Sequence, residues 1–454
     1  MSVISTKIEH MFEIEVQSQP LSVDDVHALA TALARVGADL DDAARIDMLR
    51  ALEVLACTAR GAQARVTADF DRSQRAEQAQ AGVPAERLGQ GIAAQVALAR
   101  RESPHRGQQH LGLARVLADE MPHTSHALAA GRITEWKATV LARETACLSR
   151  VDRAEVDRQV AGDLDALEAM GDRQLYGRAR GLADALDPVA AVARRRRAES
   201  ERRVTLRLAP DTMSQLTGLL PVKDGVAVWA VLSREADRLR SIGDARSRGQ
   251  IMADTLVSRV LGSGAAEAPG ASSPAPLMIN VAVPDSVLLG DDDGTGWVEH
   301  YGPVPGELLR EWIAANAEAG IDQWVRRLYV APKTGELITM DSRARRFEGG
   351  LADYLRLRDQ TCATRHCDAP VRHLDHVKAH AEGGATSAHN GQGVCEACNY
   401  AKQAPGWSAR PRPGPRHTVE TVTPTGHRYT STAPMWTVAE HGPAMSLVAF
   451  VLGA

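Results

Sequence analysis

Apolar residues recur every three to four positions through the first half of the chain. This spacing places them on one face of an α-helix. Ser22 and Asp25 stand three residues apart at the start of the first such run, as in a capping box. Further runs of the same kind follow, separated by proline, glycine and short polar stretches. The pattern predicts a mainly helical N-terminal domain over residues 21–261.

Two segments of this domain allow more than one interpretation. Helical runs before and after Pro122 fit either a helical hairpin or a DNA-binding helix-turn-helix, and the loose seven-residue connection from Pro122 to Leu128 favours the hairpin. Residues 204–208 alternate between apolar and polar side chains, which predicts a strand. Pro210 then has the character of a helix start, so we expect a helix from Pro210 to Leu220.

The composition changes at residues 262–276, which read GSGAAEAPGASSPAP. Glycine, alanine, serine and proline with a single charge are typical of a flexible linker. Beyond it, at residues 277–341, a small α+β segment is expected. Its helix would span residues 307–319, and its three strands would span residues 277–283, 325–330 and 336–340.

The end of the chain, residues 411–454, starts within the proline-rich stretch ARPRPGPRH at residues 409–417, where we expect no regular structure. The following run, TVETVTPTGHRYTST, alternates on both sides of Pro424-Thr425-Gly426. Alternation around a turn of this composition predicts a β-hairpin.

Four of the six cysteines lie close together in the sequence. Cys362 and Cys367 form a Cys-x4-Cys pair, and Cys395 and Cys398 form a Cys-x2-Cys pair. Two such pairs, separated by a segment long enough to bring the chain back, are typical of structural zinc sites. Four thiolates complete a tetrahedral Zn²⁺ and leave no position for a substrate. The zinc would therefore stabilise the fold and leave catalysis to other residues.

Side chains suited to phosphodiester hydrolysis lie around the second cysteine pair. Asp375 and His376 end an alternating run, Asn390 lies in a glycine-rich return, and Asn399 and Lys402 share one face of the helix that EACNYAKQ would start. An imidazole can take a proton from water near neutral pH. The oxygens of Asp375 and Asn399 are hard ligands that suit Mg²⁺ or Mn²⁺. We therefore expect a catalytic divalent ion beside the structural zinc.

The pattern DH…N…CxxCNxxK between two cysteine pairs resembles the HNH endonuclease family. The resemblance implies a ββα-metal fold for a nuclease module at residues 342–410, in which His376 is the general base and Asn390 braces a loop. It also implies that Asp375 and Asn399 bind the catalytic metal. The four cysteines correspond to the zinc ligands of that family. The expected fold is a mainly α N-terminal domain, a small α+β segment and a C-terminal zinc-stapled ββα-metal module.

Two positions depart from the commonest pattern of that family. Asn399 stands where many members have histidine, which should weaken binding of Ni²⁺ or Zn²⁺ at the catalytic site. Ala379 stands where many members have proline, which should leave the following loop less rigid. Lys402, Arg356 and Arg358 are candidates for contacts to DNA phosphates.

The same segment contains four more histidines, His366, His373, His380 and His389. Each of them alone is typical of a polar surface residue. His373 is the exception we favour, because it shares a face with Asp375 if the run is a strand.

The N-terminal domain resembles the DUF222 or 13E12-repeat family. The segments RRVTLRLAPDTMSQLTGLLP and RSRGQIMADTLVSRVLG carry the resemblance. Such domains commonly precede a C-terminal HNH module, so the order of the two parts agrees. The family has no assigned catalytic residues that this chain could match.

The charge distribution fits a nucleic-acid partner. The chain has a net charge of −4, yet residues 341–416 contain twelve Lys and Arg against eight Asp and Glu. A locally positive segment favours DNA as the partner. Cys57 and Cys147 stand alone and are expected to be reduced core residues. The first residues resemble no signal peptide and no apolar stretch could span a membrane, so we expect a cytoplasmic protein.

Two other functions fit the same sequence. One is a zinc-knuckle protein that binds DNA without cleaving it. The other is a protein-interaction scaffold in which the helical domain is the working part.

Overall fold

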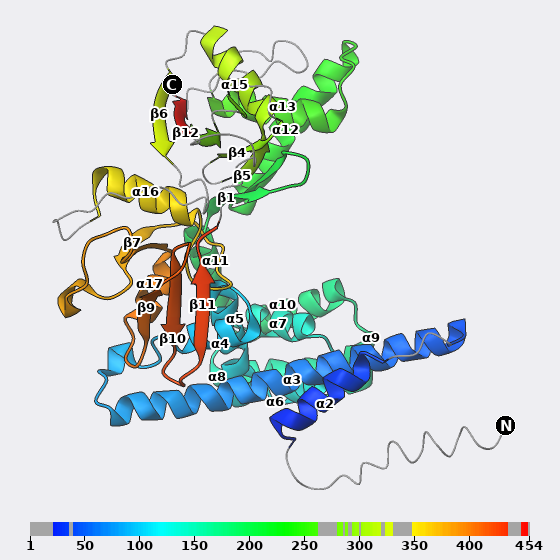
Figure 1. Cartoon of the computed structure of the whole chain (residues 1–454). Coiled ribbons are helices and arrows are strands. Elements are labelled where there is room, and N and C mark those ends of the chain that lie inside the picture. The colour runs from blue at the N-terminus through cyan, green and yellow to red at the C-terminus, as the bar shows by residue number, and fades with distance from the viewer. Residues whose placement is uncertain are drawn as a thin grey trace.

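The computed structural model of the chain (Figure 1) describes residues 21–35, 40–261, 279–284, 287–288, 293–298, 301–318, 323–329, 347–434 and 446–452. Within these residues the chain is mainly helical, and its strands form four small antiparallel sheets. The predicted linker at residues 262–276 lies outside the described residues. None of the described helices combines the length and apolar character that a membrane crossing requires.

Residues 23–261 are mainly helical. Their helices are α2 (Val23–Leu33), α3 (Asp42–Gln80), the 3-10 turn η1 (Ala85–Arg87), α4 (Ile92–Arg100), α5 (Pro104–Asp119), α6 (Pro122–Ala129), α7 (Glu135–Glu144), α8 (Arg150–Ala161), α9 (Leu164–Ala169), α10 (Asp172–Leu186), α11 (Pro188–Ser200), α12 (Val222–Ser241) and α13 (Arg248–Leu261). The helical domain is the bundle from α3 to α10, and Figure 1 shows α12 and α13 apart from it. Ser22 and Asp25 form the capping box at the start of α2, with Ser22 Oγ accepting from the Asp25 amide at 3.2 Å.

A hydrophobic core joins α5, α6, α7, α8, α9 and α10. Leu117, Leu128, Leu141 and Leu167 are among its buried side chains. The 39-residue helix α3 runs along these shorter helices (Figure 1). This packed bundle gives α4 and α5 a fixed position, and the C-terminal part of the chain docks on that side.

The structure corrects the prediction of a helix from Pro210 to Leu220. Residues 203–208 form β1 (Arg203–Leu208), and the chain returns as β2 (Ser214–Leu219) antiparallel to it. Asp211 and Thr212 between the strands have φ angles of 58° and 59°. Two consecutive residues with positive φ turn the chain sharply and match the twist of a hairpin. The helix prediction was wrong because pairing with β1 outweighed the helix-start character of Pro210-Asp211.

The α+β segment forms a five-stranded sheet with the order β5-β4-β3-β12-β6. Its strands are β3 (Ile279–Pro284), β4 (Thr295–Val298), β5 (Gly302–Pro305), β6 (Gln323–Tyr329) and β12 (Ser446–Leu452), and α15 (Gly306–Glu318) packs on it. The strand expected at 336–340 lies outside the described residues. β6 pairs with β12, which the C-terminal end of the chain contributes.

The C-terminal module comprises residues 347–434. Its elements are α16 (Gly349–Asp359), β7 (His373–His376), the 3-10 turn η2 (His380–Glu382), β8 (Gly391–Val394), α17 (Glu396–Lys402), β9 (Ser408–Arg412), β10 (Thr418–Val422) and β11 (Arg428–Thr432). β7 and β8 form a two-stranded sheet, and the other three strands form a sheet with the order β11-β10-β9. The strands β10 and β11 make the hairpin around Pro424-Thr425-Gly426.

Strand β9 was not expected, because the segment around Pro411 reads as a proline-rich break. It pairs with β10 and lies at the edge of its sheet. An edge strand tolerates proline, since one side of the strand needs no hydrogen-bond donors.

Candidate functional site

The four clustered cysteines meet at one point in the structure. Their Sγ atoms all lie within 4.8 Å of one another, and all four residues are buried. The Sγ atoms of Cys367 and Cys395 are 3.8 Å apart. Four sulfurs around a Zn²⁺ with bonds of about 2.3 Å would be separated by about 3.8 Å. The cluster therefore fits a metal ion such as zinc.

Backbone contacts explain why two distant cysteine pairs meet. Cys395 is the N-cap of α17, and its Sγ accepts a hydrogen bond from the Cys398 amide at 3.4 Å. The first pair lies on a loop that the hairpin holds, since Ala363 N donates to Gly393 O at 2.8 Å. Hydrogen bonds from the other three thiols lower the pKa of Cys395. The same contacts raise the pKa of Cys367 and Cys398, so without a metal only part of the cluster favours thiolate, the form that binds metal.

The loop between Cys362 and Cys367 carries two basic residues, Arg365 and His366. His366 has a φ angle of 62°, in the left-handed region. Partial burial, followed by the charges of Arg365 and Arg101, lowers the pKa of His366. Arg101 belongs to the helical domain, so cationic groups from two parts of the chain lie near each other here.

Strands β7 and β8 bring together the residues that suit phosphodiester hydrolysis. In this pair Asp375 faces Gln392, and His376 faces Gly391. The hairpin loop that follows is held by Asn390, whose Oδ1 accepts from Lys378 N at 2.9 Å and whose Nδ2 donates to Lys378 O at 3.0 Å.

The same Nδ2 of Asn390 also donates to Ala385 O at 2.9 Å. The loop leaves no room for a side chain at Gly384, because a Cβ atom there would lie 2.0 Å from Lys378 O. Asn390 thus ties both ends of the loop together and has no direct part in the open cleft.

His376 lies at an open cleft of about 640 Å³, which Asp375, Arg356 and Lys402 also line. The His376 ring packs against Phe347 with a centroid distance of 4.5 Å. Its Nε2 lies 2.9 Å from Thr386 Oγ1. The ring is thus oriented by one hydroxyl and one aromatic side chain, neither of which the sequence motif identifies.

Lys402 occupies the interior of this site. Its Nζ donates to Asp375 Oδ2 and to the carbonyl oxygen of His376. Lys402 is therefore engaged with the carboxylate that we expected to bind a divalent ion, whereas the sequence prediction placed it against DNA. Its ammonium group places one positive charge beside the Asp375 carboxylate.

Asn399 lies on α17, next to β7, and does not itself line this cleft. Its Nδ2 lies 2.8 Å from His373 Nδ1. Its Oδ1 is buried and makes no hydrogen bond with any of the described residues. A buried carbonyl oxygen without a partner is unfavourable, and a bound cation would satisfy it. His373 therefore acts on the site by fixing the orientation of the Asn399 amide.

The two candidate arginines of α16 have different environments. Arg356 is exposed, lines the cleft, and lies 3.7 Å from Asp353. Arg358 is buried, and its guanidinium donates to Ala388 O at 2.5 Å and to Gly391 O at 2.8 Å.

The buried position of Arg358 corrects the expectation that it contacts phosphate. Its guanidinium also pairs with Asp359, which accepts from Gly393 N at 2.6 Å. All of these contacts attach α16 to the β7–β8 hairpin. The burial of Arg358 could be predicted from the helical period, because Arg358 lies three positions after the buried Leu355 and seven after Leu351, on the same helix face.

The helical domain packs directly against the C-terminal module. Gln90 Nε2 donates to Tyr400 O of α17 at 2.9 Å, and Thr425 Oγ1 donates to Gln95 Oε1 at 3.0 Å. A Cβ atom at Gly91 would lie 2.6 Å from the Trp407 ring nitrogen, so the backbone approaches closely. These partners are hundreds of positions apart in sequence, and no local pattern indicates them.

Comparison with known protein families matches residues 47–359 to the family described as "Domain of unknown function (DUF222)". No curated protein and no solved structure matches the chain. The match begins within α3 and ends at the last residue of α16. The four clustered cysteines and the residues at 373–402 therefore lie beyond the matched part of the chain.

Proposed function

The chain belongs to the DUF222 family, and from that premise we propose a chemistry for the part that follows the family match. Residues 362–402 would form a metal-dependent endonuclease site that hydrolyses phosphodiester bonds in DNA. One observation carries the proposal: Asp375, His376 and Lys402 converge on one open cleft beside a four-cysteine cluster.

His376 is the group suited to accept a proton from the attacking water. An imidazole changes its protonation near neutral pH, which general-base catalysis requires. Thr386 holds the ring nitrogen Nε2, and packing against Phe347 limits rotation of the ring. A fixed ring keeps its proton-accepting atom at a constant position in the cleft.

The residues beside His376 fit a divalent cation. Asp375 offers a carboxylate, and Asn399 offers a buried carbonyl oxygen that has no other partner among the described residues. These would hold Mg²⁺ or Mn²⁺, which when bound supplies stabilisation of negative charge on the phosphate and the leaving oxygen. The four cysteines would hold zinc away from the reaction, as a structural site.

Binding of DNA without cleavage is the second candidate, and Lys402 is the observation that favours it. The ammonium of Lys402 is bonded to the carboxylate of Asp375. If that ion pair is permanent, no divalent ion enters, and the module is a zinc knuckle that only binds DNA.

Replacement of His376 separates these two functions. The purified full chain would be incubated with supercoiled plasmid in a series of Mg²⁺ and Mn²⁺ concentrations. We expect His376→Ala to slow nicking at least about 100-fold, the lower range for loss of a general base. Its zinc content and its affinity for a DNA duplex should not change.

His27→Ala is the matched control, because His27 is exposed on α2, far along the chain from the cleft residues. This variant should nick plasmid as the unaltered protein does. Nicking by His376→Ala at the full rate would contradict the proposal. An unaltered protein that binds duplex DNA but nicks with neither metal would favour the second candidate.

A further inference from the structure

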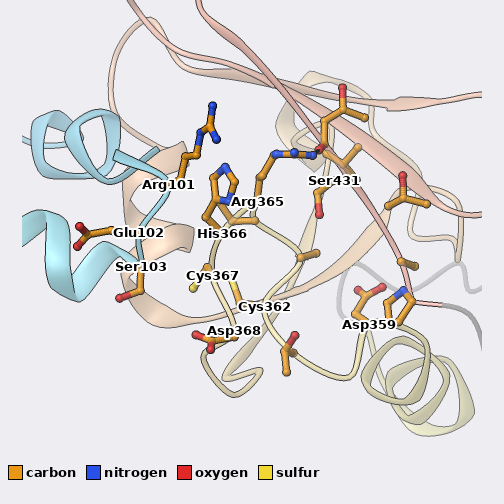
Figure 2. Close-up of a pocket in the computed structure, with 18 of the residues that line it drawn as sticks. Arg101, Glu102, Ser103, Asp359, Cys362, Arg365, His366, Cys367, Asp368 and Ser431 are labelled. Carbon is orange, nitrogen blue, oxygen red and sulfur yellow. Dashed lines mark hydrogen bonds between the residues drawn. The ribbon is translucent and has the colours of Figure 1, made fainter. Parts of the chain in front are cut away.

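A second cavity, of about 760 Å³, lies where the helical domain meets the C-terminal module (Figure 2). The junction between α4 and α5 forms one wall, and the Cys362–Cys367 loop and the end of β11 form the others. The cleft at His376 has a different lining, so this cavity is separate from the proposed catalytic site.

Basic side chains from both parts of the chain line this cavity. Arg101 and Arg106 come from the helical domain, and Arg365 and His366 come from the loop that carries the cysteines. Figure 2 shows Arg101, His366 and Arg365 together at one side of the cavity. The Arg101 side chain makes no hydrogen bond or ion pair with any residue in the described part of the chain, so its guanidinium is available to a ligand.

The acidic groups of the lining do not neutralise this side. Glu102 is engaged by His110 at 2.9 Å and by Arg106 at 3.3 Å. Asp359 is paired with the buried Arg358. Asp368 lies away from the arginines, on the other side of the cavity in Figure 2.

No residue lines both the basic cavity and the proposed catalytic cleft, but a small space between them shares lining residues with each. Lys402 lines that cleft and also a small internal space of about 30 Å³. Glu102 and Arg365 line the same small space and also the basic cavity. The basic cavity and the small space lie between the helical domain and the module, whereas the cleft at His376 is lined by the module alone.

We propose that the basic cavity binds a backbone phosphate of a nucleic-acid strand, at a site to which the helical domain contributes Arg101 and the cysteine loop contributes Arg365. A guanidinium is a planar donor that matches phosphate oxygens well. The proposal gives the helical domain a direct part in substrate binding. It rests on DNA as the ligand of the proposed function, and it does not depend on cleavage.

Salt-dependent binding of a fluorescent DNA duplex tests this site. The full chain would be titrated by anisotropy without chelator and without added Mg²⁺, so that zinc is kept and cleavage is avoided. We expect Arg101→Asn to weaken binding about 3- to 10-fold and to reduce the slope of log affinity against log salt by about one, as loss of one phosphate contact does. Asparagine suits position 101, because Arg101 has a φ angle of 58° and asparagine accepts the left-handed conformation.

Two further variants make the result specific. Arg365→Gln, from the other wall, should produce the same change in slope with unchanged zinc content. Arg173→Asn is the matched control, because Arg173 is exposed on α10 and lacks a partner among the described residues. This control should bind duplex as the unaltered protein does.

Competition with inorganic phosphate distinguishes a strand from a free ligand. If Arg101→Asn abolishes the binding of inorganic phosphate but leaves the affinity for duplex DNA unchanged, the site binds free phosphate. The assignment to a nucleic-acid strand is then overturned. Equal affinity and slope for Arg101→Asn and the unaltered protein would overturn the proposal, as would absence of duplex binding at low salt. Arg101-dependent binding in a protein that nicks no plasmid would support this site while refuting the proposed nuclease.

Discussion

The helical domain and the C-terminal module are stabilised in different ways. The domain has an extended apolar core that runs from α5 to α10. The module has a small apolar cluster around α16, and its other buried groups include the four cysteines, the Arg358–Asp359 pair and Asn390. Apolar burial stabilises a fold without any ligand, whereas buried thiols and charges depend on their partners.

This difference means that the two parts should respond independently to loss of metal or of one polar group. The domain should keep its fold when the module fails, because few of its core contacts involve the module. The contacts between Gln90 and Tyr400 and between Gln95 and Thr425 would then be lost. Three changes to the module test whether the two parts are stabilised independently.

Loss of one of the four clustered cysteines should have the largest effect. Structural zinc contributes about 10 kcal/mol or more to the folding of small zinc-dependent domains at pH 7. We therefore expect Cys398→Ser to lose zinc and to eliminate the thermal transition of the module. Calorimetry together with metal analysis measures both.

Cys57→Ser is the control for this change, because Cys57 is a buried thiol of α3 outside the cluster. It should keep its zinc and both transitions. A Cys398→Ser protein with an intact second transition would show that the module is stabilised by packing alone.

Breaking the buried ion pair should have the next largest effect. Arg358→Met leaves the Asp359 carboxylate buried without its charged partner, which costs about 3–5 kcal/mol. The transition of the module should move to lower temperature, while that of the helical domain stays in place.

Arg356→Met on the same helix provides the comparison, because Arg356 is exposed and its nearest carboxylate is 3.7 Å away. An exposed pair of this kind contributes at most about 1 kcal/mol. Similar destabilisation by both variants would mean that burial of Arg358 is not what stabilises the hairpin.

Acid should give the smallest of the three effects, through His417. Burial, reinforced by the charge of Arg358, lowers the pKa of His417 from 6.5 to about 4. The unfolded chain binds a proton at this position between about pH 6.5 and pH 4, whereas the folded chain does not. The free energy of unfolding should therefore decrease as the pH falls through that range.

Replacement of His417 isolates this contribution from acid effects at the cysteines. In His417→Gln the free energy of unfolding should depend less on pH between pH 6.5 and pH 4. The pH dependence that other groups cause should persist. Denaturant unfolding at several pH values compares the two proteins. If the free energy of unfolding changes with pH in the same way in both proteins, His417 does not titrate in this way.

Several features of the site were predictable because local chemistry determines them. The spacing of two cysteine pairs predicted their meeting, and the structure places the four Sγ atoms within 4.8 Å of one another. The burial of Arg358 could have been read from the helical period of α16. The engagement of Lys402 with Asp375 could not, because it depends on how α17 packs on β7.

The helical character of residues 23–200 and the thiol chemistry at 362–398 can be read from the residues alone, since helical period and ligand spacing act over short stretches of chain. Folded coordinates were needed to show that residues 214–219 are a strand, that β12 completes the sheet of β3 and β6, and that Arg101 lies near Arg365. Each of these depends on pairing or packing between segments whose interaction no local period encodes. Long-range contacts of this kind decide where charges gather, and with them the surface that a ligand would meet.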